Sequence, residues 1–88
     1  MLGEIKAMVS GILGPDFEVC GVEAVEHGYA ASVVSNGYLG VAYADKPDDL
    51  AVKVLDSWNR AVARDCALSR LQAKRYFVDK RTREMNGA

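Results

Sequence analysis

The sequence contains few of the residues from which catalytic and metal centres are usually built. Its 88 residues include one histidine and two cysteines. His27 follows Glu26, but no nucleophile or second base is placed beside them by spacing, so we interpret His27 as a polar turn residue. Cys20 and Cys66 lie on different expected elements, and we expect two buried free thiols rather than a disulfide or a metal-ligand pair. The sequence therefore predicts a protein that is not an enzyme and that holds no metal or cofactor.

Long apolar runs are also missing. Glycines and charged residues interrupt residues 2–13, so we expect no signal peptide at this end of the chain. No stretch approaches the roughly 18 consecutive apolar residues that a membrane-spanning helix needs. Together with the expected free thiols, these features predict a cytoplasmic protein that does not associate with a membrane.

Charge is nearly balanced overall but is divided unevenly along the chain. The formal net charge is −1 at pH 7. Residues 1–59 hold nine acidic and three basic groups, whereas residues 60–88 hold three acidic and eight basic groups. A chain with an acidic first part and a basic last part can bind anions at one end, or associate head to tail with another copy.

Apolar periodicity and turn signals predict a single α+β domain, in which a three-stranded antiparallel meander packs on a long C-terminal helix. Gly14-Pro15 is a typical end for a first helix, and Pro47 suits the first turn of the last helix. The expected elements are a short helix at residues 1–14, the meander at 17–44, the long helix at 46–83 and a loose tail at 84–88.

Turn residues set the register of the expected meander. Asn36-Gly37 between two apolar strands favours a type I′ hairpin, in which both central residues have positive φ and Val34 pairs with Leu39. His27-Gly28 is expected to form the other two-residue turn. The interrupted alternation at Gly21 predicts a bulge in the first strand.

This register gives the sheet two largely apolar faces, which differ in side-chain size. We expect the long helix to cover the face with the larger residues, and either the first helix or a partner to cover the other. The bulky face carries Phe17, Val19, Val25, Ala30, Ser32, Val34, Leu39, Val41 and Tyr43, with Glu23 among them. The smooth face carries Cys20, Val22, Ala24, Tyr29, Ala31, Val33, Tyr38 and Ala42.

The expected long helix contains no glycine or further proline after Pro47. It would be roughly 55 Å long, whereas a seven-residue strand extends only about 23 Å. Its C-terminal half would therefore overhang the sheet, or bend back after a break near Ser69. A second apolar line on that half comprises Ala67, Leu71, Val78 and Met85.

The doubly apolar sheet and the second apolar line predict a protein-binding module. Self-association is the simplest way to bury either surface, so we expect a homodimer, with a further protein as the functional partner. Aromatic and large apolar residues dominate binding hot spots. The expected interface residues are Tyr29, Val33, Tyr38, Leu71 and Val78.

In size, element order and lack of a catalytic motif, the chain resembles small accessory proteins of phages and mobile elements, in particular anti-CRISPR and related anti-defence inhibitors. The stretches that carry the resemblance are the meander FEVCGVEAVEHGYAASVVSNGYLGVAY and the charged helix behind it. It implies a host nucleoprotein or enzyme as the target and the host cytoplasm as the location. The partner-binding residues would then be an acidic patch that mimics nucleic-acid phosphates, formed by Glu18, Glu23, Glu26, Asp45, Asp48 and Asp49.

Two alternatives to an inhibitor stay open. One is a homodimeric structural or accessory protein. The other is a nucleic-acid-binding protein that uses the basic side of the C-terminal helix to follow phosphates. Asp65 and Asp79 dilute this basic side, which is also typical of a solvated helix face. The nucleic-acid contacts would be Arg64, Arg70, Lys74, Arg75 and Arg81.

Overall fold

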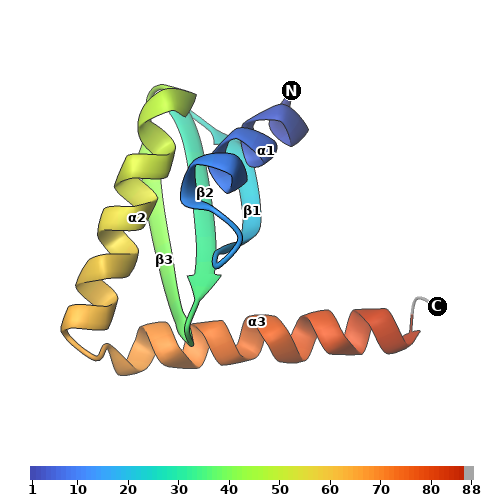
Figure 1. Ribbon diagram of the computed structural model, residues 1–88. Helices are drawn as coiled ribbons and strands as arrows, with labels where there is room; N and C mark the ends of the chain where they lie inside the picture. The colour runs from blue at the N-terminus through green and yellow to red at the C-terminus, as the bar shows by residue number, and fades with distance from the viewer. Residues whose placement is uncertain (87–88) are drawn as a thin grey trace.

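The computed structural model describes residues 1–86 and confirms the α+β class. In this part of the chain, a three-stranded antiparallel sheet is combined with three helices in the order α-β-β-β-α-α (Figure 1). The elements are α1 (Leu2–Leu13), β1 (Glu18–Val25), β2 (Gly28–Ser35), β3 (Tyr38–Ala44), α2 (Pro47–Ala63) and α3 (Ala67–Asn86). The segment expected as a loose tail, 84–88, is helical as far as Asn86, and residues 87–88 lie outside the described part.

The strands follow the order β1-β2-β3, and the register of the second hairpin agrees with the sequence prediction. Asn36 (φ 53°) and Gly37 (φ 82°) both have positive φ, as a type I′ turn requires. On β1 the register shifts between Val19 and Gly21, which confirms the predicted bulge.

The turn between β1 and β2 lies one residue earlier than the sequence predicts. Val25 pairs with Gly28, so Glu26 and His27 form the turn and Gly28 begins β2. A Cβ atom at Gly28 (φ 154°) would lie 2.3 Å from the carbonyl oxygen of Ala44. Glycine is therefore needed here because β2 approaches the end of β3 closely, and not because the residue belongs to the turn.

α2 covers the opposite face of the sheet from the one expected for the long helix, whereas α1 covers the smooth face, as one of the two alternatives had it. Both α1 and α2 pack on the smooth face (Figure 1), and the bulky face stays largely open. Val19 joins the smooth face because it pairs with Val33, before the bulge. The core on this side consists of Ile5, Val9, Val19, Ala31, Val33, Ala44, Leu50, Ala51 and Val54.

Small residues on the smooth face explain why α2 packs there. A Cβ atom at Gly40 would lie 2.8 Å from the Cβ and the backbone nitrogen of Trp58, so glycine lets the helix backbone come this close. Trp58 donates a hydrogen bond from Nε1 to the carbonyl oxygen of Ser35 at 2.9 Å. Its ring also meets that of Phe17 edge to face, with centroids 4.9 Å apart. The close approach that small residues allow decides the packing here, rather than the burial of the largest strand side chains.

The segment expected as one long helix is two helices. α2 ends at Ala63 and α3 begins at Ala67, so the chain turns at residues 64–66, before the break expected near Ser69. Asp65 has φ 47°, which ends the helical path of α2 without glycine or proline. α3 then crosses the end of the sheet where β2 turns into β3, and it extends beyond the sheet (Figure 1).

Candidate partner-binding surfaces

α3 contacts the rest of the molecule with one side only. Ser69 and Ala73 are buried, and Tyr76 and Lys80 are half-buried. At about 100° of rotation per residue these four lie along one side of the helix, and we call them the inner line. No other side chain described for α3 is buried.

Two sets of hydrogen bonds hold the inner line to the sheet. The Ser69 hydroxyl donates to the carbonyl oxygen of Leu39 and accepts from the N–H group of the same residue, both at 2.7 Å. Glu18 accepts hydrogen bonds from the Tyr76 hydroxyl and from Lys80 Nζ, the latter at 3.0 and 3.1 Å. α3 is thereby linked to β3 and to the start of β1.

These contacts shift the pKa values of the groups that make them. Hydrogen bonds from Tyr76 and Lys80 lower the pKa of Glu18 below its usual value of 4.5. Burial and the hydrogen bond to Glu18 raise the pKa of Tyr76 to about 12. At neutral pH Glu18 is therefore charged and Tyr76 keeps its proton, which are the states that the contact requires.

The opposite side of α3 is exposed and combines apolar with basic residues. Leu71, Val78 and Met85 are 53%, 54% and 75% exposed, and with the exposed Ala67 they form the second apolar line predicted from the sequence. Basic residues flank this line on both sides, given the rotation of the helix. We call this surface the outer face of α3, formed by Ala67, Leu71, Lys74, Arg75, Val78, Arg81 and Met85.

The five basic residues expected to contact nucleic acid differ in their surroundings. The three on the outer face of α3 make no ion pair within residues 1–86. Arg70 pairs with Asp65 at 3.5 Å. Arg64 lies in the turn between α2 and α3, beside a cavity of about 330 Å³. The structure therefore brings three of the five together on one exposed surface.

The six acidic residues expected to form one patch lie at two ends of the sheet. Glu18 is at the α3 end, where Lys80 and Tyr76 already bind it. The other five lie at the opposite end, where β1 ends and α2 begins (Figure 1). A single patch of all six is therefore not formed. The distant group, which we call the acidic end, comprises Glu23, Glu26, Asp45, Asp48 and Asp49.

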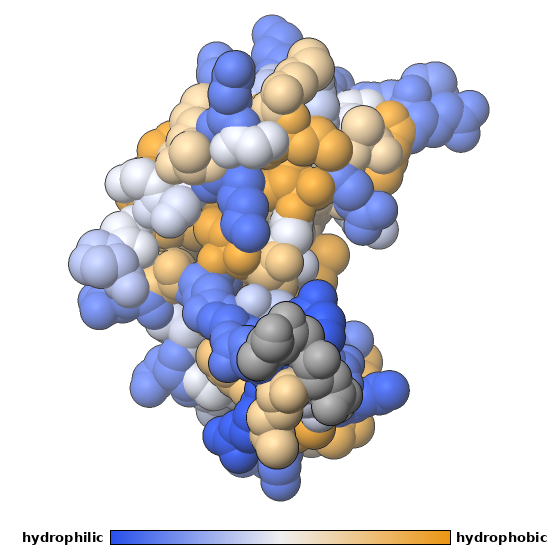
Figure 2. Space-filling view, turned by 90° about the vertical axis from the view of Figure 1, so that its right-hand side faces the viewer, coloured by the Kyte–Doolittle hydropathy of each residue, from blue (hydrophilic) through white to orange (hydrophobic). Residues whose placement is uncertain are grey.

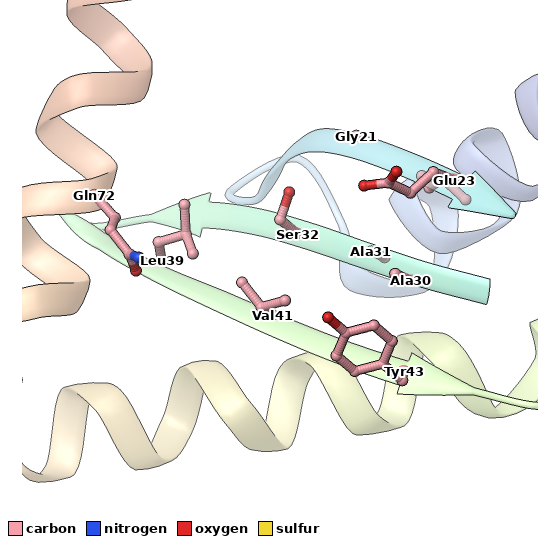
Figure 3. Close-up of a pocket in the computed structure, with 10 residues that line it drawn as sticks. Gly21, Glu23, Ala30, Ala31, Ser32, Leu39, Val41, Tyr43 and Gln72 are labelled. Carbon is pink, nitrogen blue, oxygen red and sulfur yellow. The ribbon is translucent and has the colours of Figure 1, made fainter. Parts of the chain in front are cut away.

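The bulky face of the sheet forms the floor of an open hollow. Leu39, Val41 and Tyr43 of β3 line a cavity of about 510 Å³ (Figure 3). Gln72 of α3 closes one end of this cavity, and Glu23 of β1 is the one charged residue among those that line it. Seen from the side, the hollow opens between the sheet and α3 (Figure 2).

Serine side chains close the free edge of β3. Ser57 of α2 accepts a hydrogen bond from the N–H group of Val41 at 3.2 Å, and Ser69 of α3 satisfies both backbone groups of Leu39. Unpaired strand edges are sites for pairing with another chain, and here the two helices occupy that edge. Sequence reasoning missed both serines, because a single serine in a helix gives no periodic signal.

The structure places the expected interface residues in different surroundings. Val33 is fully buried, so its side chain cannot meet a partner, and Tyr29 packs against the same core. The assignment of Val33 was therefore wrong, because α1 and α2 cover the smooth face, whereas Tyr29 is only partly buried. Tyr38 donates a hydrogen bond from its hydroxyl to Asp65, and this bond raises the pKa of Tyr38. The remaining two residues lie exposed on the outer face of α3.

The described residues, 1–86, offer little for metal binding, membrane crossing or thiol chemistry. No group of three or more His, Cys, Asp or Glu side chains in this range could hold a metal ion. None of the helices in the same range is long and apolar enough to cross a membrane. Cys20 and Cys66 are free and half-buried, and burial raises the pKa of Cys20 to about 11. Cys20 is therefore a weak nucleophile at neutral pH.

Comparisons with protein-family models, curated proteins and solved structures give no match for this chain. The resemblance in general build to anti-CRISPR and related inhibitors therefore stays a prediction. Among the surfaces described above, the outer face of α3 is the one that combines exposed apolar residues with several basic residues.

Proposed function

We propose that this chain is a protein-binding module without enzymatic activity, and that the outer face of α3 is its main contact surface. The observation that carries the proposal is the poor burial of α3. This helix has 20 residues, of which only Ser69 and Ala73 are buried among those described. An apolar line that the fold leaves uncovered on such a helix is typical of a surface that docks into a partner.

Charge around the apolar line indicates the chemistry of the partner. α3 carries six basic and two acidic residues, and Lys74, Arg75 and Arg81 lie next to the apolar residues. A complementary surface is therefore apolar at its centre and acidic at its rim. Leu71 and Val78 are the central anchors in this arrangement, because they lie midway along the outer face and have basic neighbours.

In this proposal the chain acts by occupying a surface of its target, as an inhibitor does. The resemblance to anti-CRISPR and related proteins points to a host nucleoprotein or enzyme as one class of target. Phosphate mimicry would use the five residues of the acidic end without Glu18, whose charge is already paired with Lys80. Neutralising three residues of the acidic end should abolish inhibition if mimicry operates, and leave it unchanged if α3 alone makes the contact.

A pull-down with matched variants tests the role of α3. The tagged protein is compared with Val78→Glu, on the outer face, and with Val52→Glu, which introduces the same charge at an exposed position of α2. All three are incubated with a nuclease-treated bacterial lysate. We expect one defined protein to be retained by the wild type and by Val52→Glu and to be lost from Val78→Glu.

Titration of the captured protein then gives the size of the effect. We expect Val78→Glu and Leu71→Glu to weaken binding by at least about tenfold, as for anchors at the centre of an interface. Equal binding by all variants would remove the outer face of α3 from the proposal. Thermal unfolding of each variant serves as the control for folding, and should show little change because both positions are exposed.

Nucleic-acid binding is a second candidate function, and the exposed basic residues of the outer face favour it. Fluorescence anisotropy with duplex DNA at increasing salt is the test, because each released counterion adds to the salt dependence of affinity. Binding should fall steeply with salt, and should be lost when Arg70, Lys74 and Arg75 are changed to Ala. Salt-independent binding, or none, would dismiss this candidate.

One variant separates the two candidates. Changing Leu71 and Val78 together to Ala keeps every charge on α3 and removes the apolar anchors. Protein binding through the outer face should then be lost, whereas binding to phosphates should persist. The opposite pattern would favour nucleic acid as the partner.

A further inference from the structure

The turn between α2 and α3 contains no residue that normally stops a helix. Residues 64–66 are Arg-Asp-Cys, and neither glycine nor proline occurs between Pro47 and the end of α3. The local sequence therefore favours one continuous helix across this point. Asp65 instead has φ 47°, a left-handed conformation that aspartate adopts less readily than glycine.

Few contacts keep α3 against the body of the molecule. They include the hydrogen bonds of Ser69 with Leu39 and those of Tyr76 and Lys80 with Glu18. Only two small residues of α3 are buried. We call Glu18 and the backbone of Leu39 the α3 socket. Nothing in this set of contacts requires that α3 and its socket belong to the same chain.

From these observations we propose that two copies of the chain exchange their α3 helices. In the exchanged dimer the turn at residues 64–66 straightens, so residues 47–86 form one helix of about 60 Å. α3 of each copy then occupies the socket of the other through its inner line. Each socket is completed by Ser69, Tyr76 and Lys80 of the second copy.

The length of the straightened helix makes a second copy of the chain the occupant of the socket. The molecule measures 35 × 34 × 26 Å along its principal axes, and a straightened helix carries α3 about 30 Å beyond the end of α2. α3 can then no longer reach its own socket. The α3 of another copy fits the vacated socket through the same inner line, and the exchange replaces the left-handed conformation of Asp65 by a helical one in both copies.

Charge opposes the other simple route to a dimer. Pairing of two α3 helices through their outer faces would bring Lys74, Arg75 and Arg81 of both copies together. Exchange keeps the outer faces apart and pairs Lys80 of one copy with Glu18 of the other. The outer face also stays exposed in the exchanged dimer, so this inference is independent of the proposed function.

Two substitutions at Asp65 test whether the turn controls association. Asp65→Gly relaxes the left-handed turn and weakens a straight helix, whereas Asp65→Ala does the opposite. Both remove the same contacts with Tyr38 and Arg70, so they form a matched pair. We expect the dissociation constant of the dimer to be at least about tenfold lower for Asp65→Ala than for Asp65→Gly. Analytical ultracentrifugation at several concentrations measures it, and equal constants overturn the proposal.

A charge exchange between copies tests the route of association. Glu18→Lys breaks the socket, and Lys80→Glu breaks the helix that enters it. When the two variants are mixed, an exchanged heterodimer pairs opposite charges in both of its sockets, whereas each homodimer has like charges. Native mass spectrometry should therefore show heterodimer above the statistical fraction. A statistical mixture, or no dimer in mixtures of either variant, overturns the exchange and leaves the binding role of the outer face untouched.

Discussion

α2 and α3 are helices of similar length joined by a short turn, yet they contribute to the molecule in different ways. α2 has 17 residues and buries Leu50, Ala51 and Val54 against the sheet. α3 has 20 residues and buries only Ser69 and Ala73 among those described. Apolar side chains of α2 therefore form part of the core, whereas Leu71, Val78 and Met85 of α3 are exposed. A helix that adds little to stability can carry binding residues without endangering the fold.

Truncation of a leucine in each helix should give the largest difference between them. Leu50 is fully buried and Leu71 is 53% exposed. Leu50→Ala should lower the free energy of unfolding by about 2–5 kcal/mol, because it leaves a cavity in the core. Leu71→Ala should change it by less than about 0.5 kcal/mol. Urea denaturation of both variants measures these free energies. Similar losses of stability for the two variants would contradict the difference between α2 and α3.

A substitution that blocks the close approach of α2 to the sheet should have the next largest effect on stability. Gly40→Ala places a Cβ atom 2.8 Å from Trp58, and should destabilise the protein by about 1–3 kcal/mol because the helix must move. Gly11→Ala is the control, since a Cβ atom at Gly11 meets no heavy atom within 4 Å. It should be neutral or stabilise α1 by up to about 1 kcal/mol. The midpoint temperatures of thermal unfolding of the two variants should therefore shift in opposite directions or differ clearly.

Local signals were sufficient to predict the strands, the second hairpin and the bulge. Asn36-Gly37 specifies a type I′ turn through its own backbone preferences, and the register of β2 and β3 follows from it. The covered face of the sheet could not be predicted in the same way. It depends on the contact between Gly40 and Trp58, which are 18 positions apart and belong to different elements. Val33 was consequently assigned to a partner although it lies in the core.

The turn before α3 could not be predicted for a similar reason. Asp65 carries no strong helix-breaking signal, and its conformation accompanies contacts with distant residues, among them the hydroxyl of Tyr38. The outer face of α3 was predicted better. The spacing of Leu71 and Val78 identified an apolar line apart from the core, and both residues are exposed in the structure. Apolar periodicity identifies the faces of a helix correctly even when the direction of that helix in the fold is predicted wrongly.

Removing the hydroxyl of Ser69 should have a smaller effect on stability, and this effect should be confined to α3. Ser69→Ala removes both hydrogen bonds to the backbone of Leu39, which should weaken the docking of α3 by about 1–2 kcal/mol. Hydrogen exchange should then increase in residues 67–86 and stay unchanged in residues 47–63. Ser57→Ala, which loses one longer bond to β3, is the matched control and should have the weaker effect. Equal exchange throughout both helices would show that α3 is not a separate unit.

Acid should loosen α3 before it affects α2, and this is the smallest effect expected. The pKa of Glu18 is lowered in the folded protein by its hydrogen bonds from Tyr76 and Lys80. Its contribution to stability is therefore fully present above the unfolded pKa, near 4.5, and is lost as the pH falls through the lower folded value. Because the ion pair is more than one-third exposed, solvent screening limits this contribution to about 1 kcal/mol or less.

The charge of Glu18 can be removed to isolate this effect. In wild-type protein, hydrogen exchange of residues 67–86 should increase as the pH falls below 4.5, relative to residues 47–63. Glu18→Gln has no carboxylate to take up a proton in this range, so its α3 should already be loosened at neutral pH and should change little on acidification. An acid-induced loosening of α3 that is as large in Glu18→Gln as in the wild type would have to come from another carboxylate.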